Sequence, residues 1–191
     1  MNRGGTRRWL LGPAGAVRWL RRPLLMALAD VADARKARSR TALEHLAGLR
    51  PEVASRVRLS RAVDAPLLDP DAGIRNSALD AVRVWATPEN AATLVKLLGS
   101  LHGERSESDA RTGDRVAQAL IAIGPGVEDV VVPLLRSADA SVRCEACAIL
   151  GEVGTARSIQ PLDDAGVAFL GLDPGFYGQT RLAAAKIAAR Q

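Results

Sequence analysis

The sequence predicts an all-α protein built from helix pairs that stack side by side. Three observations support this fold class. Alanine and leucine, which favour helices, are abundant, whereas aromatic residues make up only 3% of the 191 residues. The one run that resembles a strand, "VEDVVVPLL", contains Pro133, which cannot donate a hydrogen bond to a sheet. A helical pattern of apolar residues also recurs along the chain.

Four segments carry this recurring pattern: "GIRNSALDAVRVWAT", "DRVAQALIAIG", "SVRCEACAILGEVGT" and "QTRLAAAKIAAR". When they are aligned on a central alanine, the residue four positions later is apolar in each, and residues four apart lie on one face of a helix. The aligned pairs are Ala78 and Val82, Ala119 and Ile123, Ala146 and Leu150, and Ala184 and Ala188. We therefore expect each segment to be a helix with one buried face. A weaker copy surrounds Ala42.

Another apolar segment precedes each of the first three copies, namely "VDAPLL", "NAATLVKLL" and "VVVPLL". The turns between the two segments contain aspartate or proline, as in "LLDPDAGIR" and "RSADASVR". Aspartate caps an incoming helix, and proline ends one helix or begins the next. The predicted unit is therefore helix, short turn, helix. Residues 99–113, "GSLHGERSESDARTG", are rich in glycine, serine and charge and are expected to form an inserted surface loop.

The stretches "LLDPDAGIRNSALDAVRVWATPENAATLVKLL" and "VVVPLLRSADASVRCEACAILGEVGTARSIQPL" are the most specific part of the sequence. Their turn aspartate, followed by "IR" or "VR" and by alanines, resembles HEAT and HEAT-like repeats, including arrays found in planctomycete bacterial proteins. The resemblance covers roughly residues 40–190. It implies a right-handed α-solenoid of about four helix pairs, related to armadillo-like helical folds, in which neighbouring pairs complete each other's core.

The resemblance also implies a ladder of aspartate and arginine residues along the turns. An arginine stands three residues before the central alanine in three of the four segments, and an aspartate lies in the turn before it. We expect each arginine to pair with an aspartate of a neighbouring turn. Anion binding along a groove is the alternative role for these arginines. The ladder residues are Asp71, Arg75, Asp139, Arg143, Asp173 and Arg181.

Charge divides the chain into two parts. Residues 1–40 contain ten Arg or Lys against two Asp, giving +8, whereas residues 41–191 contain sixteen against nineteen acids, giving −3. We expect a basic arm over residues 1–23 and a repeat domain over residues 24–191. The arm combines arginine with tryptophan, which suits an anionic membrane surface or nucleic-acid phosphates. A disordered tail, the remnant of a longer protein and a protein-binding segment are the other interpretations. Its candidate residues are Arg7, Arg8, Trp9, Arg18, Trp19, Arg21 and Arg22.

The two cysteines, Cys144 and Cys147, form a C-x-x-C motif. Zinc requires four ligands, and the two histidines, His45 and His102, are distant in sequence with no helpful spacing. Cys147 aligns with apolar positions of the other segments, so a buried structural cysteine explains it. Cys144 lies in the first helical turn beside Arg143, and both features lower the pKa of a thiol. We interpret the motif as structural and leave the reactivity of Cys144 open.

The sequence predicts a non-catalytic protein-interaction or scaffold module. It offers no catalytic triad, metal site or cofactor-binding motif, and no small-molecule substrate is expected. Nucleic-acid or anionic-membrane binding through the arm is the alternative function, and a HEAT-like lyase is the third. No run approaches the ~18 apolar residues of a membrane span, and the cysteine usage fits a reducing compartment, so we expect a cytoplasmic protein. The expected contact residues, on the second helices, are Asn76, Arg83, Gln118 and Glu145.

Overall fold

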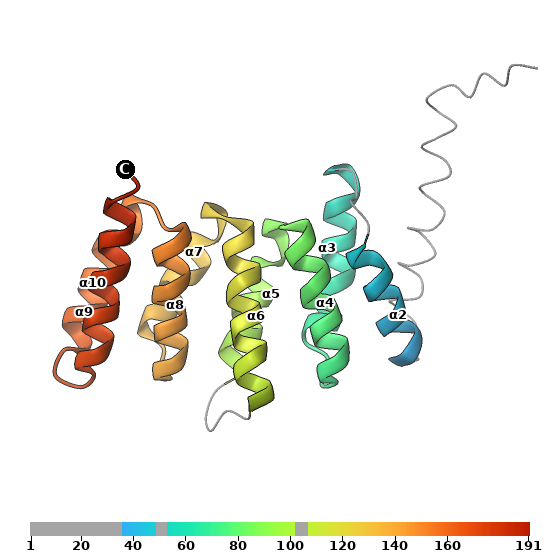
Figure 1. The fold of residues 1–191 in the computed structure, drawn as a ribbon, viewed down its shortest axis with the longest axis horizontal. Helices are drawn as coiled ribbons and strands as arrows, with labels where there is room; N and C mark the ends of the chain where they lie inside the picture. The colour runs from blue at the N-terminus through green and yellow to red at the C-terminus, as the bar shows by residue number, and fades with distance from the viewer. Residues whose placement is uncertain (1–35, 49–52, 102–106) are drawn as a thin grey trace, which may run out of the picture.

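The computed structural model describes residues 36–48, 53–101 and 107–191. The basic arm over residues 1–23 lies outside these ranges. Every regular element within them is a helix, which confirms the predicted all-α class. The helices form a row two layers deep (Figure 1).

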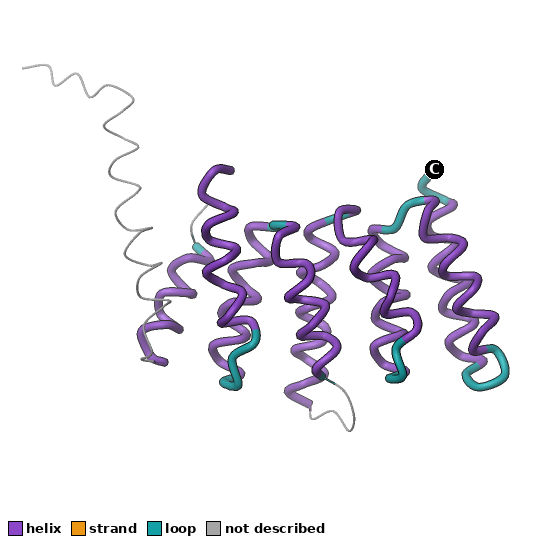
Figure 2. The backbone as a smooth tube through the Cα atoms, turned by 180° about the vertical axis from the view of Figure 1, so that it is seen from behind, coloured by secondary structure: helices purple, strands orange, loops and turns teal. Residues whose placement is uncertain are grey.

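We call the two layers A and B. In layer A, each helix contacts the next member of the layer along the row, and Figure 1 shows most of this layer in front. Layer A consists of α2 (Lys36–Ala47), α4 (Ala72–Trp85), α6 (Glu107–Ile123), α8 (Ala140–Val153) and α10 (Pro174–Ala188). Layer B, which lies nearer the viewer in Figure 2, contains α3 (Val53–Leu67), α5 (Ala91–Ser100), α7 (Glu128–Val131) and α9 (Ala156–Phe169). It also contains the 3-10 turns η1 (Pro88–Asn90), η2 (Pro125–Val127) and η3 (Val132–Arg136).

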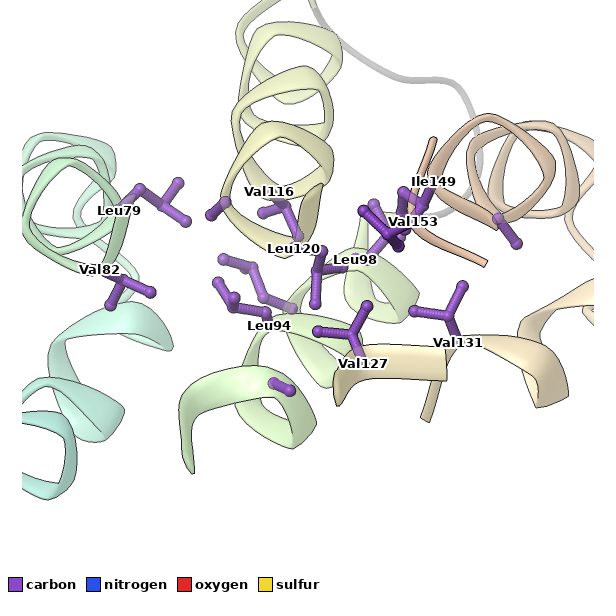
Figure 3. Close-up of a cluster of buried hydrophobic side chains, with 14 of the residues drawn as sticks. Leu79, Val82, Leu94, Leu98, Val116, Leu120, Val127, Val131, Ile149 and Val153 are labelled. Atoms are coloured by element: carbon purple, nitrogen blue, oxygen red, sulfur yellow. The ribbon is translucent and has the colours of Figure 1, made fainter. Parts of the chain in front are cut away.

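The core lies between the two layers (Figure 3). Aliphatic side chains from four or more helices meet there, and most of them are completely buried. Full burial of one such side chain contributes about 1.5–3 kcal/mol relative to leaving it in water. The labelled core residues are Leu79, Val82, Leu94, Leu98, Val116, Leu120, Val127, Val131, Ile149 and Val153.

Aspartates begin three of the layer A helices. Asp71, Asp139 and Asp173 are the N-caps of α4, α8 and α10, and each side chain accepts a hydrogen bond from a backbone N–H of the first turn. The caps stand 68 and 34 residues apart along the chain. The same intervals relate buried residues three positions after each cap, Ile74, Val142 and Phe176. The aspartate caps and the buried residues therefore give the same alignment of α4, α8 and α10.

This spacing corrects the sequence alignment of α6 and α10. The buried residues of α10 fall at Phe176, Thr180, Ala183, Ala184 and Ile187, so Thr180 is the counterpart of Ala146. Ala184, the predicted counterpart, lies one turn further on. By the same burial pattern, the counterpart in α6 is Val116 rather than Ala119. Ala188 is exposed, so the expected apolar contact there is wrong; Ile187 is buried instead. An alanine-rich helix fits several registers one turn apart, and only packing selects among them.

The inserted loop is shorter than the expected 99–113. Helix α5 continues to Ser100, and α6 begins at Glu107. Thr112 is buried and lies four residues before the buried Val116, so the inward face of α6 extends back to Thr112. Residues 102–106 lie outside the described ranges.

The strand-like run near Pro133 forms no strand. Its first residue, Val127, ends the 3-10 turn η2, and the rest is divided between the short helix α7 and the 3-10 turn η3, with Pro133 near the beginning of η3. Proline removes one backbone hydrogen bond at this point, where the α-helical pattern gives way to a 3-10 turn. The prediction that this run is not a central strand is therefore confirmed.

Candidate functional site

Arg75 of α4 and Arg143 of α8 each donate hydrogen bonds to two carbonyls of the turn before their helix. The Nη1 group of Arg75 donates to the carbonyls of Asp69 and Pro70 at 2.9 and 2.8 Å. The Nη1 group of Arg143 donates to the carbonyls of Ser137 and Ala138 at 3.0 and 3.1 Å. In both cases the acceptors lie six and five residues earlier, in the turn before the helix. Each arginine therefore supplies a hydrogen-bond donor to carbonyls of the turn and ties the turn to the helix that follows it.

Arg143 is also held by an ion pair and by two aromatic rings. Its Nη2 group lies 3.0 Å from Asp173 Oδ2, and its side chain is only 6% exposed. The guanidinium carbon lies 4.2 Å from the centre of the Phe169 ring and 5.2 Å from that of Phe176. The two rings pack edge to face at 5.6 Å. Arg143 thus joins α8 to the turn between α9 and α10.

The three predicted ladder arginines do not behave alike. Arg143 reaches the aspartate of the following turn, as the ladder requires. Arg75 donates to backbone carbonyls of its own turn. Arg181 pairs with Asp163 of α9 at 3.2 Å, with both side chains largely solvent-accessible. Because Tyr177 occupies the position in α10 that corresponds to Arg143, Arg181 is not a member of the same series.

A buried carboxylate that sequence reasoning missed joins two layer B helices. Glu128, at the start of α7, is 3% exposed and accepts hydrogen bonds from the N–H and hydroxyl of Thr155 and from the hydroxyl of Ser158. Burial alone would raise the pKa of Glu128, but these hydrogen bonds and the charge of Arg157 outweigh it and lower the pKa. The acidic residue in "GVEDVVV", between apolar neighbours, was the available sequence signal.

The predicted contact residues lie on layer A but differ in accessibility. Arg83 and Gln118 are exposed, and Arg83 Nη1 lies 3.5 Å from Gln118 Oε1, which links α4 to α6. Asn76 and Glu145 are half-buried, so the expectation that they are exposed is only partly right. The carbonyl of Asn76 accepts a hydrogen bond from Arg115, which also pairs with Asp80. Polar side chains therefore bridge α4 and α6.

The corresponding place between α8 and α10 is an open apolar groove. Helix α8 aligns with α4 at an interval of 68 residues, so Asp80 corresponds to Ala148 and Arg83 to Gly151. Helix α10 aligns with α6 at an interval of 64 residues, so Gln118 corresponds to Leu182. The Asp80–Arg115 and Arg83–Gln118 bridges thus have no ion-pair or amide counterpart at these positions, and a groove of about 190 Å³ remains beside the Lys186–Glu152 pair that joins α8 to α10. Leu182 is 61% exposed at its edge. The remaining lining residues are Cys144, Cys147, Gln179, Ala183 and Lys186.

Sequence reasoning missed this groove although the signal was present. The aligned segments that contain Ala78 and Ala146 already place Ala148 and Gly151 opposite Asp80 and Arg83. Only the neighbouring helix α10, whose register the alignment misplaced, shows that the vacated space lies beside an exposed leucine.

Both cysteines line this groove, and neither has an activated thiol. Burial raises the pKa of Cys147, which is 2% exposed, to about 12. Burial is also the largest cause that raises the pKa of Cys144, followed by the negative charge of Asp173. The charge of Arg143 and a hydrogen bond with Gln179 lower it but are outweighed. Arg143 therefore lowers the pKa of Cys144 as expected, but burial has the larger effect and the net pKa is raised.

We expect slow thiol modification of the native protein at pH 7. A raised pKa leaves less thiolate at neutral pH, so the labelling rate of Cys144 should lie below that of an unfolded thiol and increase with pH beyond pH 9. Cys147 should react only after unfolding. Mass spectrometry of iodoacetamide-treated protein, with the Cys147→Ala variant isolating Cys144 and denatured protein as the reference, measures both rates. Fast labelling that persists down to pH 6 would contradict the structural interpretation.

No group of three or more His, Cys, Asp or Glu in residues 36–48, 53–101 and 107–191 is arranged to hold a metal ion. Within the same ranges no single helix is long and apolar enough to span a membrane. One bent pair, residues 111–123 and 125–136 at 114°, satisfies the length and composition criteria together.

Comparison with known proteins gives the fold alone. No protein family matches the sequence, and no curated protein matches it. Three crystal structures of engineered proteins from the Northeast Structural Genomics Consortium are similar. Their TM-scores are 0.50, 0.54 and 0.53 at 21%, 18% and 19% identity, and they cover 86%, 87% and 87% of this chain. The matches cover 79%, 48% and 79% of those proteins, so the chain spans about half of the second one. This likeness supports the helical architecture and names no activity.

Proposed function

We propose that the protein is a HEAT-like, right-handed α-solenoid that acts as a non-catalytic protein-interaction or scaffold module. Its four helix pairs would be α3 with α4, α5 with α6, α7 and η3 with α8, and α9 with α10. The recurring aspartate caps and the shared task of Arg75 and Arg143 support this repeat assignment. Stacked helix pairs of this kind provide extended surfaces for macromolecular partners.

The observation that carries the proposed function is the groove between α8 and α10. Leu182 is 61% exposed beside a groove lined by small residues, and a partner's apolar side chain could fill that groove and pack against Leu182. The helices α4 and α6 close the same place with polar bridges. The proposed contact surface is therefore on layer A and is centred on Leu182. Arg83 and Gln118 are exposed on the same layer.

A pair of matched substitutions tests this proposal. Leu182→Glu places a charge at the edge of the groove, and Val84→Glu places the same charge on α4, where the side chain is 50% exposed and the corresponding residue of α8 is Glu152. Proteins retained by the native chain would be identified by affinity capture, and their binding would then be measured with purified components. We expect Leu182→Glu to weaken binding at least tenfold, as for a central interface residue, and Val84→Glu to leave it unchanged. Equal effects of the two variants, or none, would contradict the proposal.

A further inference from the structure

The positive charge of the folded part is concentrated at one end of the row. Residues 36–48 and 53–101, which contain α2 to α5, hold nine Lys or Arg against six acids, a net charge of +3. Residues 107–191 hold eight against eleven, a net charge of −3. The charge asymmetry noted for residues 1–40 therefore continues into folded helices. In Figure 1 α2 and α3 lie at the end of the row opposite α9 and α10.

Cations elsewhere in the described structure are mostly engaged. Arg115 pairs with Asp80, Arg157 with Asp129, and Lys186 with Glu152. Arg75, Arg143 and Arg190 donate to backbone carbonyls. These side chains hold the row together, so their charges are partly neutralised within the molecule.

Three cations at the positive end are not engaged in this way. Arg58 and Arg61 on α3, and Lys96 on α5, are exposed, and none forms a hydrogen bond or ion pair with any residue that the structure describes. The two helices contact each other in layer B. Arg58 and Arg61 are three residues apart, so they project from neighbouring turns of one helix face, with Cβ atoms about 5–6 Å apart.

The acids near these cations do not cancel them. Asp64 accepts hydrogen bonds from Asn90 and Thr93, and these contacts direct its carboxylate toward η1 and α5. Glu89 is the remaining acid of α3, η1 and α5. With both carboxylates counted, the four cations of α3 and α5 exceed the acids of α3, η1 and α5 by two, so this surface attracts anions.

We propose that the outer surface of α3 and α5, through Arg58, Arg61 and Lys96, binds the phosphate backbone of a nucleic acid. A duplex carries about one negative charge per 1.7 Å of its axis, so neighbouring phosphates can engage cations on adjacent helical turns. A membrane is the less suitable polyanion, because no aromatic side chain is exposed in the described part of the chain to enter the interface. This surface lies on layer B and is distinct from the groove between α8 and α10.

Fluorescence anisotropy with a fluorescein-labelled, 20-base-pair DNA duplex of mixed sequence tests this proposal. The full chain is compared with an Arg58→Gln/Arg61→Gln double variant. We expect the double variant to bind about 10- to 50-fold more weakly in 100 mM salt, and the slope of log K against log salt to decrease by about 1.8, since each phosphate contact contributes about 0.9. Lys96→Gln should reduce the slope by about half that amount.

The matched control is Arg136→Gln/Arg181→Gln, which removes the same charge from two exposed residues outside α3 and α5. It should leave the affinity within about twofold. Four results would overturn the proposal: no DNA binding by the full chain, equal weakening in the control, unchanged binding in the Arg58→Gln/Arg61→Gln variant, or binding to phosphatidylserine vesicles without binding to DNA. Circular dichroism and thermal unfolding confirm that each variant is folded. None of these results depends on Leu182, so this proposal and the proposed function fail independently.

Discussion

Replacing Arg143 with alanine should lower the free energy of unfolding by about 3 kcal/mol. The change leaves Asp173 without its partner, leaves the carbonyls of Ser137 and Ala138 without a donor, and removes the cation between Phe169 and Phe176. Breaking a buried ion pair commonly costs about 3–5 kcal/mol, and the partial exposure of Asp173 places the effect at the lower end. Thermal unfolding followed by circular dichroism should show a Tm lower by about 6–12 °C.

Arg181→Ala is the control for this prediction because it removes the same charge from the same part of the fold. The pair of Arg181 and Asp163 is solvent-accessible, and such pairs contribute less than about 1 kcal/mol. Similar losses from the two substitutions would show that the aromatic and carbonyl contacts of Arg143 are unimportant. Binding to a partner should be the same in both variants once the protein is folded.

Replacing Glu128 with alanine should cost about 2–4 kcal/mol at pH 7. The buried hydroxyl of Ser158 and both donors of Thr155 then lose a charged acceptor, and each buried group left without a partner costs about 1–3 kcal/mol. The adjacent Asp129→Ala is the control, since Asp129 and Arg157 form a pair with both side chains more than 70% exposed. Urea denaturation measures both. A loss for Asp129→Ala as large as that for Glu128→Ala would be inconsistent with the buried network.

The stability provided by Glu128 should also depend on pH in one direction. The folded state lowers the pKa of Glu128, so the ionised form favours folding. This contribution is complete above the unfolded pKa, at about pH 4.5, and is lost as the pH falls through the lower folded value. The difference between the native protein and Glu128→Ala should therefore shrink in urea denaturation below about pH 4. A difference that grows in acid would mean that the carboxylate is not the stabilising form.

The sequence predicted the helical class and the turn aspartates because these depend on local chemistry. Asp71, Asp139 and Asp173 bond to N–H groups two or three residues away, and such contacts can be inferred from short patterns. The register of α10 could not be inferred in the same way, since "RLAAAKIAAR" presents small apolar residues at several equivalent registers. Phe176 and Ile187, buried against neighbouring helices, select the register.

The candidate site was harder to predict because it depends on contacts between distant segments. Arg75 and Arg143 donate mainly to backbone carbonyls, which a sequence does not distinguish from one another. The groove beside Leu182 exists because Ala148 and Gly151 lack the polar atoms of Asp80 and Arg83, so its signal is a difference between the aligned helices α4 and α8. The free cations of α3 could not be recognised before the partners of the other arginines were known.

The short helix α7 gives the row a mechanical property that its continuous helices do not have. Layer A keeps helices of 14 to 17 residues from α4 to α10, whereas the middle of layer B has four residues of α-helix followed by a 3-10 turn that contains Pro133. The 3-10 geometry makes poorer hydrogen bonds, and proline donates none. We therefore expect the row to bend most easily at α7 and η3, with layer B changing its length more than layer A. A partner that curves the row should then change the distance between α3 and α9 more than the spacing along layer A.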